Sequence, residues 1–171
     1  SSAASDVYKR QLLTMTSRLW KNIRIKECHE PLISIPKSVF RLTPHPYMSL
    51  GAPYLMGEDP WVLRKSVLKR LIEAQEYLSE INPHVQLALF DAWRPIPVQK
   101  FMFDYTIHET CKSRGIDIND HSEKTNINEI IGEVGNFWAK PTKNSSTPPP
   151  HSTGAAIDLT LADMSLSLIH I

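Results

Sequence analysis

The spacing of apolar residues along the chain predicts three helices. Between Asp59-Pro60 and Ile81, apolar residues recur at steps of three and four, and Asn82-Pro83 is a typical helix end. The residues expected to form its buried stripe are Val67, Leu71, Ala74, Leu78 and Ile81. The same spacing predicts a second helix from about Pro97 to Ser113. A third helix is predicted by the apolar residues Ile127, Ile130, Ile131, Val134 and Trp138.

Strict alternation predicts two strands, and prolines mark a more irregular region. Residues 84–90 and 157–161 alternate with a period of two, so each is expected to be a strand. In the second strand, Ile157, Leu159 and Leu161 are expected to face the core and Asp158 the opposite side. Residues 32–54 carry several prolines and predict an edge strand or a covering arm. His45 lies between two of these prolines and is interpreted as a loop residue rather than a metal ligand.

Length and charge exclude several classes of protein. The chain has 171 residues, which predicts one domain, and its net charge of +1 offers no field that would collect nucleic acid or an anionic membrane. Cys28 and Cys111 cannot form a disulfide framework, and neither lies in a CxxC pattern. No apolar run is long enough to span a membrane, and no signal peptide is visible, which favours the cytoplasm. The composition does not predict an oligomeric state.

The two ends of the chain differ in composition from the rest. Residues 1–11 are polar and have no periodic pattern, and residues 164–171 follow the last predicted strand without a further predicted element. We expect both segments to be non-native or linker-derived, which leaves residues 12–163 as a partial domain.

One candidate group of chemically active residues directly follows the first predicted strand. Asp91-Ala-Trp-Arg94-Pro95 places an acid and a base where a buried strand ends and a turn begins. Two interpretations stay open at this point: a structural ion pair that braces the turn, and a catalytic arginine. Both can hold together, because Asp91 can orient Arg94.

A second candidate group lies in the last predicted strand. His151 and Asp158 have six residues between them, and the small residues Gly154, Ala155 and Ala156 let the chain bend there. An imidazole nitrogen beside a carboxylate suits zinc. By spacing alone, a loop histidine and a surface aspartate are the favoured interpretation, because H-x6-D is a short pattern.

Taken together, these motifs resemble a known family. The segments F-D-A-W-R-P at residues 90–95, V-Q-x-x-M at residues 98–102 and P-P-P-H-S-T-G-A-A-I-D-L-T-L at residues 148–161 are similar to the zinc D-alanyl-D-alanine dipeptidases. This family includes the vancomycin-resistance type of dipeptidase and is grouped with the zinc D,D-carboxypeptidases. The likeness extends over roughly residues 32–161 and depends on the motifs occurring in this order.

The resemblance implies a fold and a set of roles. The fold would be α+β, a small antiparallel sheet with helices packed on one side, of the kind shared by Hedgehog and D,D-peptidase domains and incomplete at its C-terminal end. His151 and Asp158 would be two of three ligands of one zinc ion, Arg94 would stabilise the transition state, and Asp91 would lie behind them. In the family, a later E-x-x-H motif supplies the general-base glutamate and the third ligand, and this sequence contains no such motif.

The function implied by the resemblance is hydrolysis of the D-alanyl-D-alanine dipeptide, a small substrate from peptidoglycan metabolism. Two alternatives stay open. One is a D,D-carboxypeptidase or endopeptidase of the same group that acts on longer peptidoglycan peptides. The other is a zinc-fold binding domain without catalysis, since folds of this kind can keep their ligands after losing a base.

Overall fold

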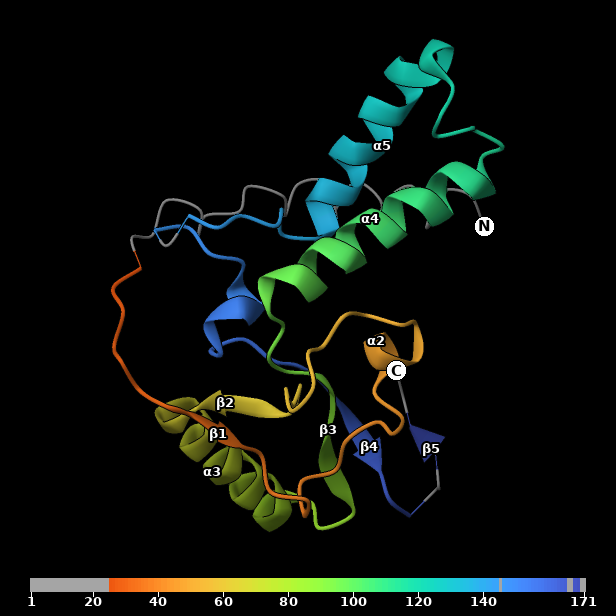
Figure 1. The fold of residues 1–171 in the computed structure, drawn as a ribbon. Helices are drawn as coiled ribbons and strands as arrows, with labels where there is room; N and C mark the ends of the chain where they lie inside the picture. The colour runs from red at the N-terminus through yellow and green to blue at the C-terminus, as the bar shows by residue number, and fades with distance from the viewer. Residues whose placement is uncertain (1–24, 145, 166–167, 170–171) are drawn as a thin grey trace.

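The computed structural model describes residues 25–144, 146–165 and 168–169. Its helices and antiparallel strands form an α+β fold, as the resemblance implied (Figure 1). The segment 1–11, expected to be non-native, lies outside the described residues, as do four positions of the segment 164–171. Within the described residues, no helix is long and apolar enough to cross a membrane.

The described strands form two small sheets. In the first, β1 (Leu32–Ser34) pairs antiparallel with β2 (Val62–Arg64). In the second, β4 (Asp158–Asp163) lies between β3 (Val85–Asp91) and β5 (Leu168–Ile169), again antiparallel. The predicted strands at residues 84–90 and 157–161 are therefore confirmed as β3 and β4, within a residue or two at their ends.

The start of the first predicted helix was placed too early. The helix α3 spans Lys65–Ile81, and the residues before it form β2 instead. Asp59 accepts a hydrogen bond from the Trp61 amide at 2.9 Å, which makes a local turn rather than a helix cap. Pairing with β1 then buries Leu63 completely, so tertiary contacts outweigh the local helix signal. The predicted end at Ile81 is confirmed.

The buried face of α3 also differs from the predicted stripe. Leu68 and Leu71 are buried against the core formed with Ile35, Leu63 and Leu89, while Ile81 is 65% exposed. The residues of α3 that contact this core lie between Val67 and Ile72, in the first half of the helix, and Ile81 lies in its last turn, away from that core.

The other two predicted helices are confirmed. The helix α4 spans Ile96–Ser113 and α5 spans Lys124–Phe137, with the short 3-10 helix η2 (His121–Glu123) before α5. In Figure 1 the two helices project together away from the sheets. They share their own core of Phe103, Ile107, Cys111, Ile130 and Val134.

The prediction that Leu159 and Leu161 face the core was wrong. They are 41% and 50% exposed. In the antiparallel register Leu159 is paired with Leu89 and Leu161 with Leu87, so these residues share a face of the sheet. The helix α3 contacts β3, and no described element covers the same face of β4, whereas Ala162 on the opposite face is buried.

The proline-rich arm at residues 32–54 is extended, as predicted, except for one short helix. This helix, α2, spans Pro46–Ser49, and His45 is its N-cap. Before this helix, the arm passes close to β3 (Figure 1). There the Leu42 amide donates to the Leu89 carbonyl at 2.9 Å, and the Leu89 amide donates to the Phe40 carbonyl at 3.0 Å. The arm is thereby held beside the end of β3 that carries Asp91.

Candidate metal centre

A β-bulge brings Asp91 and Asp158 to the same place. Leu89 is paired with Leu159, but the next pair is Asp91 with Asp158, so Phe90 is an extra residue in β3. Such a bulge changes which face the following side chain points to. Asp91 and Asp158 therefore lie as neighbours at the end of the β3–β4 pair.

His151 is held above these two carboxylates by backbone contacts. It lies in the 3-10 helix η3 (Pro150–Thr153), and its carbonyl accepts a hydrogen bond from the Arg94 amide at 3.2 Å. The Ser152 hydroxyl donates to the Arg94 carbonyl at 2.7 Å. Gly154 then turns the chain into β4 with a φ of +73°, in the left-handed region, where a Cβ would also clash with Leu32.

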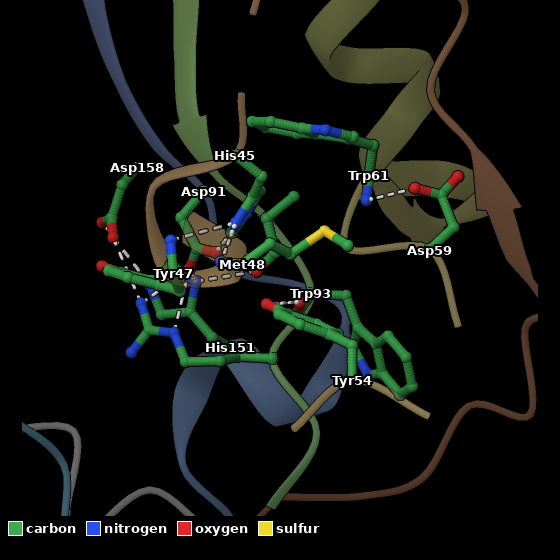
Figure 2. Close-up of polar contacts among 12 residues, drawn as sticks. His45, Tyr47, Met48, Tyr54, Asp59, Trp61, Asp91, Trp93, His151 and Asp158 are labelled. Carbon is green, nitrogen blue, oxygen red and sulfur yellow. Dashed lines mark hydrogen bonds and ion pairs between the residues drawn. The ribbon is translucent and has the colours of Figure 1, made fainter. Parts of the chain in front are cut away.

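The contacts of the His151 ring determine which nitrogen carries the proton when the ring is neutral. Nδ1 lies 2.8 Å from the carbonyl oxygen of Ala92, and because a carbonyl only accepts, Nδ1–H is the donor. Nε2 is then left facing Asp158 Oδ1 at 3.4 Å (Figure 2). A hydrogen bond to a backbone carbonyl that directs the other nitrogen outward is the usual arrangement behind a metal-binding histidine.

The spacing of these two atoms fits one metal ion. Two ligand atoms of a tetrahedral zinc with bonds of 2.0–2.1 Å lie about 3.3 Å apart. His151 Nε2 and Asp158 Oδ1 are at 3.4 Å, and Asp158 Oδ2 turns the other way, toward Arg94 Nη2, also at 3.4 Å. The predicted approach of His151 to Asp158 is therefore present, and their role as zinc ligands remains a prediction.

Asp91 is close enough to join a metal group, but its oxygens already have other partners. One oxygen each from Asp91 and Asp158 and one nitrogen of His151 lie within 4.8 Å of one another. Asp91 Oδ2 accepts from Arg94 Nη2 at 2.7 Å and Nε at 3.0 Å, and lies 3.2 Å from His151 Nδ1. An oxygen that contacts two cationic groups is a poor metal ligand, so Asp91 Oδ2 is better placed to orient Arg94 and His151 than to bind an ion.

The ionisation of Asp91 agrees with this position. Its side chain is fully buried, and burial alone would raise the pKa of this carboxyl group. Close contacts with the imidazoles of His151 and His45, with the charge of Arg94, outweigh burial and hold the pKa of Asp91 well below its ordinary value. Asp91 is therefore a carboxylate at neutral pH.

Arg94 is fixed on all sides. Besides Asp91 and Asp158, it donates from Nη1 to Gln99 Oε1 at 2.8 Å, and Gln99 Nε2 donates to the Ala139 carbonyl at 2.6 Å. The rings of Tyr47 and Trp138 lie 5.0 and 4.9 Å from its guanidinium carbon. Aromatic faces at this distance stabilise a cation and prevent it from rotating.

His151 carries a perturbed pKa in the metal-free protein. Burial lowers the pKa of its imidazole, but the hydrogen bonds to Asp158 and Asp91 outweigh that effect and raise the pKa to about 9. At neutral pH a metal ion must therefore displace a proton from His151 to bind there.

A cavity of about 390 Å³ opens beside this group. The cavity is lined by polar and aromatic residues together with one alanine and one proline. These are Tyr47, Arg94, Gln99, Phe137, Trp138, Ala139, Pro150, His151 and Asp158. Cavities of a few hundred Å³ that combine apolar walls with a few polar groups are typical of small-molecule sites.

The sequence interpretation missed several residues of the site. His45 was interpreted as a loop residue, although a polar residue followed by proline is a helix-start signal that would have identified it as a cap. Trp138 was assigned to a helix stripe, yet it follows α5 and contacts Arg94. Nothing in the local pattern distinguishes Tyr47 or Gln99 as neighbours of Arg94.

These features define a carboxylate–histidine group with an adjacent buried arginine, and such a group could hold one metal ion. Residues 41–171 match the D-ala-D-ala dipeptidase family, and the chain belongs to this family. Over 144 residues it is 46% identical to a D-alanyl-D-alanine dipeptidase of Synechocystis sp. (strain ATCC 27184 / PCC 6803 / Kazusa), an alignment that covers 82% of this chain. The chain spans 57% of the length of that relative. No solved structure matches it significantly.

Proposed function

We propose that this chain contributes the zinc-holding part of a dipeptidase that hydrolyses D-alanyl-D-alanine. The observation that carries the proposal is the 3.4 Å approach of His151 Nε2 to Asp158 Oδ1 directly beside the Arg94 guanidinium. Family membership and the name of the Synechocystis relative support the choice of substrate.

In this proposal His151 and Asp158 hold one zinc ion. Bound zinc supplies a Lewis acid and lowers the pKa of a coordinated water to about 7. The residues of this chain prepare the site for it. The Ala92 carbonyl accepts from Nδ1–H of His151, which directs Nε2 toward Asp158. His151 Nε2, once deprotonated, and Asp158 Oδ1 would hold the ion, while Asp158 Oδ2 contacts Arg94.

Arg94 is proposed to stabilise the negative charge that develops on the scissile carbonyl oxygen. A guanidinium whose orientation is already fixed needs no rearrangement when that charge appears, which is the condition for effective electrostatic stabilisation. Asp91, Gln99 and the two aromatic rings provide that fixation. The general base and the third ligand are assigned, by resemblance, to an E-x-x-H motif that the printed sequence does not contain.

The cavity of about 390 Å³ beside Tyr47, Phe137 and Trp138 has room for a small substrate such as a dipeptide. The choice of the dipeptidase over the carboxypeptidase or endopeptidase of the same group follows the name of the Synechocystis relative, and the substrate comparison below tests it.

The test is to load the complete polypeptide encoded by the gene with zinc and to measure alanine release. The substrates are D-Ala-D-Ala, L-Ala-L-Ala and a muropeptide pentapeptide that ends in D-Ala-D-Ala. Turnover of the free D-dipeptide above the other two supports the proposal. Preference for the pentapeptide would make the protein a carboxypeptidase, and zinc binding without turnover of any substrate would make it a binding domain.

A further inference from the structure

His45 lies beneath the metal centre and is one of the most enclosed polar side chains of the described structure. It is 5% exposed. Its ring is surrounded edge-on by the rings of Tyr47, Tyr54 and Trp61, with centroids 5.6, 5.7 and 4.8 Å away. Figure 2 shows the ring directed at Asp91. A histidine buried in this way needs polar partners for both nitrogens.

One nitrogen has a structural partner. Nδ1 accepts from the backbone amides of Tyr47 at 3.3 Å and Met48 at 3.5 Å, which caps α2. An accepting nitrogen carries no proton, so in the neutral ring the proton is on Nε2. His45 therefore presents an N–H donor on the side away from α2.

That donor faces Asp91. Nε2 lies 3.2 Å from Asp91 Oδ1, although the alignment falls short of an ideal hydrogen bond. Neither atom has a hydrogen-bond partner elsewhere among the described residues. Because His45 Nε2 and Asp91 Oδ1 are buried and each has only the other as a polar partner in the described structure, their contact fixes the rotation of the Asp91 carboxylate. The other oxygen, Oδ2, is the one that holds Arg94 and His151.

We propose that His45 is a positioning residue of the metal centre: its Nε2–H anchors Asp91 Oδ1, so that Oδ2 is held where it orients both the Arg94 guanidinium and the His151 imidazole. A carboxylate anchored at one oxygen only can rotate about its bond to Cβ. A carboxylate anchored at both oxygens fixes the position of Arg94, the proposed donor to the substrate, relative to His151, the proposed metal ligand. This inference rests on the proposed zinc site of His151 and Asp158, but its effect on zinc affinity does not depend on which substrate is hydrolysed.

The two functions of His45, capping and anchoring, can be separated by substitution. In His45→Asn the amide oxygen takes the place of Nδ1, and asparagine is among the best N-cap residues, but the side chain is too short to reach Asp91. In His45→Gln the amide nitrogen takes the place of Nε2 and reaches Asp91, while the cap is weakened. His108→Asn, on the exposed side of α4, is the matched control for the chemical change.

The experiment measures three quantities for each variant of the complete polypeptide: zinc affinity by competition with a chelator, kcat and KM for D-Ala-D-Ala, and the Tm of the metal-free protein. We expect His45→Asn to keep the wild-type Tm within a few degrees, to lose zinc affinity by about 10- to 100-fold, as for other groups behind a metal ligand, and to lose kcat rather than KM. His45→Gln should recover most of the zinc affinity despite a lower Tm, and His108→Asn should change nothing.

Wild-type zinc affinity in His45→Asn would overturn the proposal and leave His45 as a helix cap. The double variant gives a second test. If His45→Asn lowers zinc affinity by the same factor in the wild type and in Asp91→Asn, its effect does not pass through Asp91, and the proposal is overturned.

If His45→Asn does not fold, NMR of the His45 ring supplies the test. The ¹⁵N spectrum of the metal-free wild type should show the Nε2–H tautomer of His45, and a proton on Nδ1 contradicts the proposal. Failure of D-Ala-D-Ala hydrolysis alone would reject the proposed function and leave the zinc-affinity comparison intact.

Discussion

Asp91 and Asp158 are backbone partners across β3 and β4, and both of their carboxylates contact the same guanidinium, that of Arg94. The two contacts differ in kind. The fully buried Asp91 lies 2.7 Å from Arg94 Nη2, whereas the half-exposed Asp158 lies at 3.4 Å and directs its second oxygen to His151. The bulge at Phe90 makes this division possible, because it turns Asp91 inward beside a residue that faces the cavity.

Replacement of the proposed metal ligand Asp158 should abolish zinc binding. In Asp158→Ala the carboxylate opposite His151 Nε2 is lost, and a site with fewer ligands has an incomplete coordination sphere. We expect less than stoichiometric zinc after dialysis and no detectable D-Ala-D-Ala hydrolysis, measured by metal analysis and alanine release. Glu133→Gln, which removes a surface ion pair with Arg114, is the control and should keep both properties. Full zinc occupancy in Asp158→Ala would exclude Asp158 as a ligand.

Replacement of the arginine should separate metal binding from turnover. Arg94→Lys keeps a positive charge but loses the planar group that contacts Asp91, Gln99 and Asp158 together. We expect zinc stoichiometry to be unchanged and turnover to fall by roughly 10²- to 10³-fold, as for the loss of one oxyanion donor. Loss of zinc in parallel with turnover would show that Arg94 acts structurally.

The metal-free protein should lose a stabilising contribution as the pH rises. The pKa of His151 in the folded state is raised to about 9, above the value of about 6.5 expected for an unfolded chain. Its charged form therefore stabilises the fold fully below about pH 6.5, and this contribution disappears as the pH rises through about 9. The Tm of chelator-treated protein should fall over this window, and His151→Gln should flatten the fall. An unchanged slope in that variant would contradict the assignment.

The pH should affect zinc binding in the opposite direction. Because zinc must displace the His151 proton, its apparent affinity should rise by up to tenfold per pH unit between pH 7 and about 9 and then level off. Calorimetry in buffers of different ionisation enthalpy would detect the released proton. An affinity that does not change with pH would show that His151 is not titrated when zinc binds.

Replacement of Gly154 at the turn between η3 and β4 should destabilise the folded protein. A side chain there is strained at φ +73° and would clash with Leu32, and the Gly154 carbonyl accepts the Arg64 amide at 2.9 Å. We expect Gly154→Ala to destabilise the protein by at least about 1–3 kcal/mol in urea unfolding. Gly132→Ala in α5 meets no atom within 4 Å and should instead be neutral or stabilising by up to about 1 kcal/mol. Equal stability of both variants would contradict this account.

Several parts of the fold could be predicted from local pattern alone. The helices α4 and α5 and the strand β3 follow from the spacing of their apolar residues, because this spacing already determines which face of an element can be buried. The candidate residues Asp91, Arg94, His151 and Asp158 were identified differently, because only the resemblance of their motifs to the dipeptidase family gave them roles, and these roles stay predictions.

Other features were decided by tertiary contacts, for reasons that no local pattern contains. The segment before α3 became β2 because β1 offered a partner that buries Leu63, and Leu159 and Leu161 stayed exposed because no described element covers that part of the sheet. Above all, the surroundings of Asp91 depend on three separate segments. They are the bulge in β3, the arm that carries His45, and η3, which carries His151. The sequence by itself determined which residues are candidates for the chemistry; the tertiary structure decided which of them face the cavity and which contact the others from behind, because orientation depends on partners far away in the chain.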